Sequence, residues 1–349
     1  MFLSYQVNDD TREFFENEEV LVLGEDDKGV ISYSRSTTHN LYSYSEKKYS
    51  NLIVPYTTIK QSKLARQYGV REAVYEVFHR PDKSPILRSM LDLWGFDNYH
   101  NYLYTICELG FLEGLIPVID FGFLTPDEIN DLMEVVAIIK TFIYTDYDCL
   151  MDRDGIRTLQ RSFDIRSKVL TWSAKLELPI STGIFLHQDL PKERIKEFAE
   201  LIADNIKLYD SVHDVVIQTY SRTADITFPK VTDKLLKYTY ETFRSVIPKH
   251  IPVIIADPSI AMLDMVLSNG ETDIGALSDR ILGSKDGQQY WDDLQALLKK
   301  KQLKLQLRFP LRKAFIKEQR YSKKLGQIFD AFKYKIKKDL LEKQKYATM

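Results

Sequence analysis

Residues 178–185 read LPISTGIF, and residues 214–220 read DVVIQTY. Both runs are rich in β-branched and aliphatic side chains and show little alternation between apolar and polar positions. This pattern is typical of strands buried on both faces of a parallel sheet. Six further runs of the same kind lie at residues 30–33, 73–77, 115–119, 135–144, 252–256 and 303–309.

Helix-like segments lie between these runs, at residues 98–112, 127–136, 192–205 and 231–245. The first predicts an apolar stripe of Leu103, Ile106, Leu109 and Leu112. Thr125 precedes the second, with Pro and acidic residues after it, which is typical of a capped helix start. Strands and helices in alternation favour a single α/β domain, a TIM-type (β/α)8 barrel at residues 29–311. A doubly wound open sheet is the alternative.

The two ends of the 349-residue chain carry opposite charge, although the net charge is −2. Residues 1–28 form an acidic N-terminal extension and residues 312–349 a basic C-terminal tail, with one long amphipathic helix at residues 315–345. The two ends are expected either to lie against each other or to leave the tail free. A free tail predicts an acidic partner surface or nucleic acid as its ligand. The helix itself fits either a cap on the barrel or a basic arm for a membrane surface, RNA or a partner.

Composition excludes several classes of protein. Hydrophobic residues make up 44% of the chain and charged residues 28%, as in a globular protein with a packed core. The apolar runs are too short for a transmembrane segment, and no signal peptide is evident, so a cytoplasmic location is expected. Two cysteines, Cys107 and Cys149, exclude a disulfide scaffold. The six histidines include no pair at i, i+4 spacing, and no glycine-rich loop or nucleophile elbow is present.

Several segments, taken in order, resemble one known family. They read ISYSR at residues 31–35, LEGLIP at 112–117, LPISTGI at 178–184, DVVIQTY at 214–220 and RFP at 308–310. The residues of these segments and their order resemble those of the FO synthases (7,8-didemethyl-8-hydroxy-5-deazariboflavin synthases), which are radical-SAM enzymes that form a deazaflavin. The resemblance is to the CofG-type subunit of these enzymes. The resemblance implies a barrel with its site at the carboxyl ends of the strands and a second subunit as partner.

The chain departs from this family where the family binds its cofactors. The resemblance places the cluster-binding Cys-x3-Cys-x2-Cys motif at Ser45, Tyr49 and Leu52, none of which is a soft thiolate ligand. Positions that touch S-adenosylmethionine (SAM) in the family become Phe78, His79 and Tyr144. We therefore expect that both the four-iron (4Fe-4S) cluster and SAM are lost, that the chain has no cofactor, and that no metal is bound.

Four residues are candidates for a catalytic role at the barrel mouth: His79, Asp120, His187 and Gln218. The two histidines predict an acid–base pair or metal site aided by nearby carboxylates, or else solvated loop side chains without a role. Gln218 predicts either a ligand contact inside the barrel or a buried amide satisfied by its neighbours. Ser181 and Thr182 fit an interior role, yet hydroxyl groups are common on barrel strands.

Two main hypotheses on function follow. The first is a catalytically degenerate CofG-like pseudoenzyme that acts as a binding or regulatory partner in a protein assembly, beside a true radical-SAM subunit or another protein. The second is a cluster-independent enzyme that holds a small molecule, such as a deazaflavin precursor, in the barrel mouth. A third alternative is an adaptor that binds RNA or an acidic partner through its basic tail.

Overall fold

The computed structural model describes residues 29–40, 42–45, 48–67, 70–77, 84–121, 124–145, 149, 159–208, 210–220, 228–282 and 284–307. The predicted acidic extension at 1–28 and the basic tail at 312–349, with its helix, lie outside these residues. Their predicted roles, and the domain boundaries that depend on them, stay predictions.

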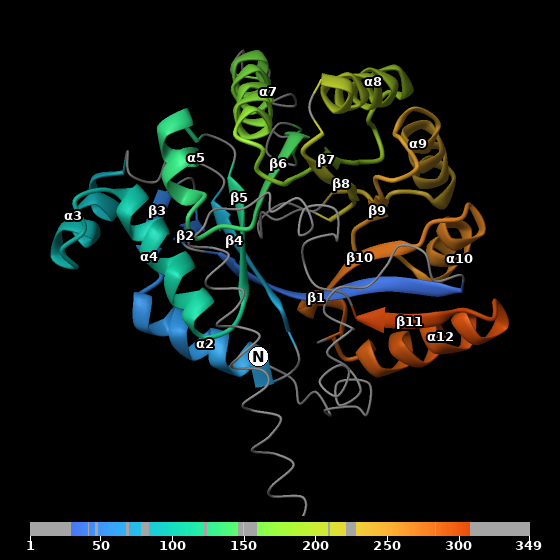
Figure 1. Cartoon of the computed structure of the whole chain (residues 1–349), viewed down its shortest axis with the longest axis horizontal. Coiled ribbons are helices and arrows are strands. Elements are labelled where there is room, and N and C mark those ends of the chain that lie inside the picture. Colours follow the sequence, from blue (N-terminus) through green and yellow to red (C-terminus); the bar gives the residue numbers. More distant parts are fainter. Residues whose placement is uncertain are drawn as a thin grey trace, which may run out of the picture.

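Eight parallel strands follow one another in space as they do along the chain (Figure 1). Each strand pairs with the next in parallel register from β1 to β9, and β10 returns to pair with β1. The strands are β1 (Val30–Asn40), β4 (Glu72–Val77), β5 (Ile116–Phe121), β6 (Ile138–Tyr144), β7 (Ile180–Phe185), β8 (Val212–Gln218), β9 (Val253–Ile255) and β10 (Asp273–Ser278).

This order decides between the two predicted architectures. A doubly wound sheet reverses its strand order at a switch point, whereas here the order runs in one direction from β1 through β4 to β9. The α/β class and the TIM-like arrangement are confirmed as a parallel half-barrel. Closure into the complete (β/α)8 barrel that the sequence predicts would require a ladder between β9 and β10, and the described strands contain none there.

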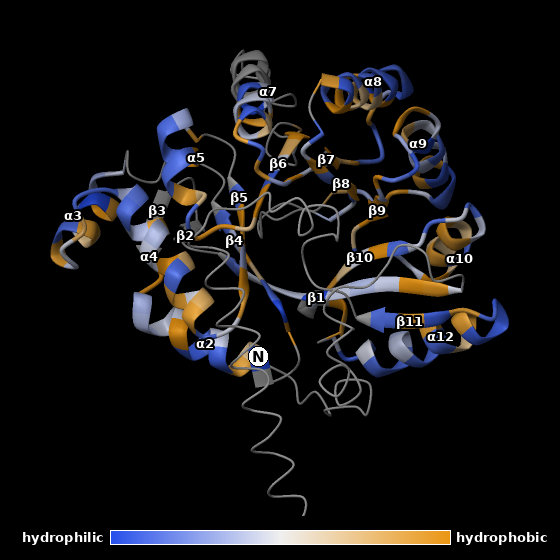
Figure 2. Ribbon diagram, in the orientation of Figure 1, coloured by the Kyte–Doolittle hydropathy of each residue, from blue (hydrophilic) through white to orange (hydrophobic). Residues whose placement is uncertain are grey.

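Helices cover the outer face of the half-barrel (Figure 1), and in Figure 2 the outer sides of α8 and α9 are coloured largely as hydrophilic. Within the described part of the chain, no helix is long and apolar enough to span a membrane. The helices are α2 (Pro55–Gln67), α3 (Pro85–Leu93), α4 (Tyr99–Leu112), α5 (Pro126–Leu132), α7 (Leu159–Lys175), α8 (Lys192–Leu208), α9 (Asp233–Val246), α10 (Ile260–Ser268), α11 (Asp279–Leu282) and α12 (Gly287–Lys300).

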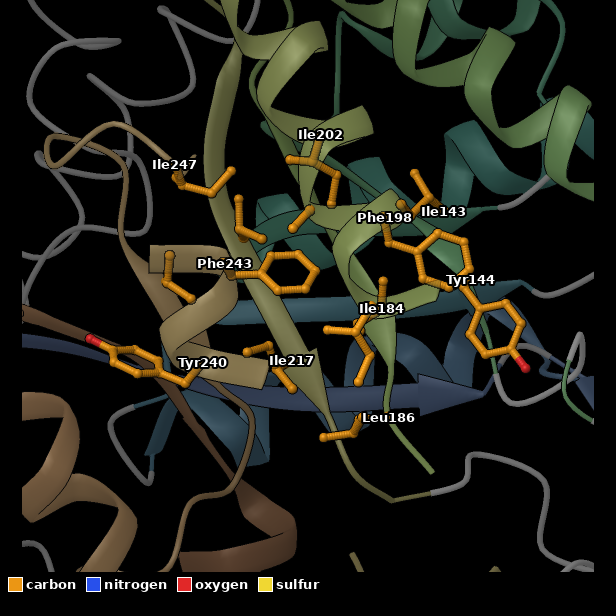
Figure 3. Packing of buried hydrophobic residues seen from close by; sticks show 14 of the residues in the cluster. Ile143, Tyr144, Ile184, Leu186, Phe198, Ile202, Ile217, Tyr240, Phe243 and Ile247 are labelled. Carbon is orange, nitrogen blue, oxygen red and sulfur yellow. The ribbon is translucent and has the colours of Figure 1, made fainter. Parts of the chain in front are cut away.

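The largest apolar core lies between strands β7 and β8 and helices α8 and α9 (Figure 3). Phe198 and Ile202 of α8 and Phe243 of α9 point onto Ile184 and Ile217 of the two strands. Each of these side chains is almost fully buried, so each contributes on the order of 1.5–3 kcal/mol to the free energy of folding. This packing holds the carboxyl ends of β7 and β8 in place.

The eighth strand of the half-barrel differs from the prediction. Residues 303–309 were expected to supply it, but β11 (Lys304–Leu307) pairs only with the first residues of β1. β10 takes the place, although its sequence DIGALS has small residues and little strand character. The glycine in this strand is explained by packing: the β10 backbone lies so close to Ile254 that a Cβ on Gly275 would be 2.6 Å from a side-chain carbon of Ile254.

The predicted stripe on α4 is partly wrong. Leu103 and Ile106 are buried as expected, but Leu112 is 62% exposed at the end of the helix. The buried face is completed instead by Tyr99, Tyr102 and Cys107. The prediction counted only leucine and isoleucine as core positions and left out the aromatic residues, so it placed the apolar stripe on a slightly different face of the helix.

The start of α5 confirms the predicted cap. Thr125 Oγ1 accepts from the backbone of Glu128, and the Glu128 carboxylate accepts from the backbone of Thr125. We expect Thr125→Ala to lower the free energy of unfolding by about 1 kcal/mol, because the backbone N–H of Glu128 loses the hydroxyl that accepts its hydrogen bond. Urea unfolding measures the change, and Thr125→Ser, which keeps the hydroxyl, is the control; equal stability of all three proteins would contradict the prediction.

Candidate functional site

Polar side chains line the inner face of the half-barrel. Ala73 and Tyr75 of β4 pack outward against helices, so Glu72 and Glu76 face inward by strand alternation. The strand register then continues this inner row across the sheet. Glu76 lies opposite Asp120, which lies opposite Lys140, then Ser181 and then Asp214.

Two sets of contacts connect this inner row. The Lys140 ammonium lies 3.5 Å from the Asp120 carboxylate. Ser181 donates to Asp214 at 2.5 Å, and the other oxygen of Asp214 lies 2.7 Å from Nδ1 of His213. All of these carboxylates are buried, and each is paired with a cation or a donor. Burying ionised groups is costly unless they are paired in this way.

An apolar cluster adjoins this polar row. Phe142, Val216 and Ile254 form a small buried cluster with Ala256. The Lys140 ammonium lies 5.0 Å from the centre of the Phe142 ring, where the polar row meets this cluster. The polar row and the apolar cluster therefore lie at successive inward-facing positions of the same strands, since Lys140 and Phe142 are two residues apart on β6.

Aromatic side chains gather where β6 and β7 end. The Tyr144 hydroxyl lies 3.3 Å from Nε2 of His187, and the Tyr144 ring stacks on Phe198 at 5.1 Å (Figure 3). The rings of Phe185 and Phe228 lie within 6.3 Å of the His187 ring. His187 is only 8% exposed, so the alternative that it is a solvated loop histidine is wrong.

The other predicted candidates have different outcomes. Asp120 is buried in the polar row described above. Gln218 ends β8, and its side-chain amide donates to the backbone oxygen of Tyr220 at 3.0 Å, as in the alternative of a satisfied buried amide. His79 lies outside the described residues, as does Phe78, so the predicted pairing of His79 with His187 stays a prediction.

The segment expected to correspond to the family's cluster loop is an antiparallel hairpin. β2 (Tyr42–Ser45) pairs with β3 (Lys48–Leu52), with Ser45 opposite Lys48 and Tyr49 opposite Tyr44. The Leu52 side chain is buried in the apolar core beneath α4. In the described residues this segment therefore forms a paired hairpin that is anchored in the core through Leu52.

Several residues of the site were missed from sequence. Lys140 is a single charge within the apolar run of residues 135–144, and that isolation was a usable signal. Asp257 and Ser278, which follow and end two neighbouring strands, gave no signal because their contact depends on the fold.

The protein is thus an α/β half-barrel with a polar site along its inner face, and its sequence can be compared with those of known proteins. No protein-family model matches the chain. It is 24% identical over 244 residues to the 7,8-didemethyl-8-hydroxy-5-deazariboflavin synthase of Methanosphaerula palustris, covering 68% of this chain and 73% of that protein. Against the synthases of the same name from Methanosarcina acetivorans and Archaeoglobus fulgidus, identity is 22% and 20%, with 80% and 77% of this chain covered and 85% and 84% of those proteins.

Among solved structures, the HMG-CoA lyase from Brucella melitensis superposes with a TM-score of 0.49 and 12% identity, covering 83% of this chain and 99% of that chain. The resemblance inferred from the sequence motifs is confirmed by the curated homologues. The chain is a divergent homologue of the FO synthases, similar to them across most of its length.

These homologues correct one expectation. The sequence led us to expect that the cluster and SAM are both absent, but the homologues are FO synthases, of a family that uses both. The chain's two cysteines do not form the family's ligand set, since the motif needs three thiolates and neither Cys107 nor Cys149 lies within residues 45–52. Burial also raises the pKa of the Cys107 thiol. No chemical step is therefore assigned through a cluster, and catalytic degeneracy and a partner role stay predictions.

Proposed function

We propose that the protein binds a small molecule of the deazaflavin class, an aromatic ring system with a polyhydroxylated chain, inside the half-barrel at the carboxyl ends of its strands. The observation that carries this proposal is the Asp120–Lys140 pair of the interior, in which Asp120 is buried and the Lys140 side chain is 16% exposed. Barrel interiors are normally filled by branched apolar side chains, and a packed apolar pair would serve stability at least as well. Charges in this position are therefore best explained by a ligand.

The polar row and the apolar cluster match the two parts of such a ligand. Asp120 and Asp214 are acceptors for hydroxyl groups, and Lys140 is a donor. The apolar cluster around Phe142 suits a planar aromatic system. The similarity to proteins named for the synthesis of a deazariboflavin supports this choice of ligand class.

Calorimetry with 7,8-didemethyl-8-hydroxy-5-deazariboflavin as the probe tests the proposal. We expect the wild-type protein to bind it, and Lys140→Met and Asp120→Asn each to weaken binding about tenfold or more, because hydrogen bonds to charged groups contribute roughly 1.5–3 kcal/mol. The matched control is Lys237→Met, a change at an exposed lysine of α9 that should leave affinity unchanged.

Removing one member of a buried pair can also reduce stability. The double variant Asp120→Asn with Lys140→Met removes both charges, so it should regain much of the thermal midpoint while its affinity stays low. Absence of binding by the wild type, or unchanged affinity in all three site variants, would contradict the proposed function.

A further inference from the structure

Asp257 has an unusual backbone conformation at the end of a barrel strand. It lies two residues beyond Ile255, the last residue of β9, and its φ is +47°. Apart from glycine, this left-handed region is adopted mainly by asparagine and aspartate, and such conformations concentrate at functional sites. The seven-residue stretch of the chain around it, IIADPSI, contains no glycine to relieve the conformation.

The Asp257 carboxylate is held by a residue of the neighbouring strand. Ser278 Oγ, at the end of β10, lies 2.7 and 2.9 Å from its two oxygens. Ser278 therefore fixes the orientation of the carboxylate.

Strand register places this pair at the inner face. Ser278 lies opposite Ser36 of β1, and Ser36 lies opposite Glu72 of β4, which faces inward. Ala256, the residue before Asp257, packs with the interior apolar cluster. Asp257 thus lies at the border of that cluster, at the edge of the half-barrel where the carboxyl ends of the strands meet.

A phenol lies close to this carboxylate. The Tyr290 hydroxyl is buried, and within the described part of the chain no hydrogen-bond partner is found for it. Burial and then the negative charge of Asp257 raise the pKa of Tyr290, which keeps the phenol protonated. A carboxylate and a buried phenol hydroxyl therefore lie near each other at this edge of the half-barrel.

We propose that Asp257, oriented by Ser278, is a specificity-determining residue that accepts a hydrogen bond from a hydroxyl group of the bound ligand. This inference rests on the proposed function, because it assigns one contact of that ligand. The left-handed conformation supports it, since asparagine or glycine would suit the backbone at least as well and would lack the charge.

Two substitutions separate a ligand contact from a structural role. Asp257→Asn keeps the size and tolerance of the left-handed region, and Asp257→Gly relieves it. Both should weaken binding of the deazariboflavin probe about tenfold, while the thermal midpoint stays equal or rises. Gln302→Gly is the matched control, because Gln302 also has a positive φ (58°) but lies in an exposed turn after α12; it should leave affinity unchanged.

The outcomes are distinct. Wild-type affinity in both Asp257 variants overturns the inference alone and leaves the proposed function standing. Weaker binding accompanied by a clear fall in the thermal midpoint overturns it too, because Asp257 would then be structural. If the wild-type protein does not bind the probe, the proposed function and this inference both fail.

Discussion

Replacing Arg244 by methionine is expected to lower the free energy of unfolding by about 3–5 kcal/mol, because it leaves a buried carboxylate without its cation. Arg244, at the end of α9, lies 2.7 Å from Glu271, whose side chain is 6% exposed. Its guanidinium also donates to the backbone oxygens of Ile247, Pro248 and Ile251. The Arg244 side chain thus binds backbone oxygens that follow α9 and also neutralises Glu271, which precedes β10.

Urea unfolding at pH 7 measures this loss. The matched control is Arg194→Met, which removes an exposed ion pair with Glu197 and should change stability by less than about 1 kcal/mol. The double variant Arg244→Met with Glu271→Gln should recover part of the loss, since no charge is then left buried. A loss below 1 kcal/mol in the single variant would show that the pair contributes little.

The pH dependence of this variant has a defined sign. Burial raises the pKa of Glu271 even with Arg244 present. Without the cation that pKa rises further, so the variant's folded state binds a proton that the unfolded state has lost. Its stability therefore falls as pH increases, and its deficit against wild type should be smaller at pH 5 than at pH 7.

His39 is expected to make the protein sensitive to acid. Burial lowers its pKa to about 4 from an ordinary 6.5, so the folded protein holds it neutral. Below pH 6.5 His39 binds a proton in the unfolded chain but stays neutral in the folded state. Stability is complete above that pH and is lost as pH falls toward 4, by about 3 kcal/mol in total.

Substitution by phenylalanine removes the titration and keeps a ring that can stack on Tyr75, as His39 does at 5.5 Å. His39→Phe should therefore lose less stability between pH 7 and pH 4.5 than the wild type. His250→Gln, at an exposed position, is the control and should follow the wild type. Identical pH profiles for wild type and His39→Phe would contradict this assignment.

Local sequence was sufficient for features that depend on neighbouring residues. Apolar runs such as residues 180–185 predicted strands buried on both faces, and Thr125 with Glu128 predicted a capped helix start. Both depend on side-chain chemistry within a few positions along the chain. β10 escaped this reasoning because Gly275 is selected by its contact with Ile254, a residue of another strand.

The candidate site shows the same division. Asp120 was named from sequence, but its partner Lys140 was not, because their contact depends on the register between β5 and β6. His187 was named, while its burial among aromatic rings depends on the packing of β6, β7 and α8. Asp257 and Ser278 are 21 residues apart and meet only at the ends of two strands.

The sequence by itself therefore determined the α/β class, the positions of most strands and helices and the likeness to FO synthases, because these follow from local patterns and ordered motifs. Only the tertiary structure decided which charges are paired inside the half-barrel and which strand completes it. The reason is that strand register and side-chain burial arise from contacts between residues distant along the chain.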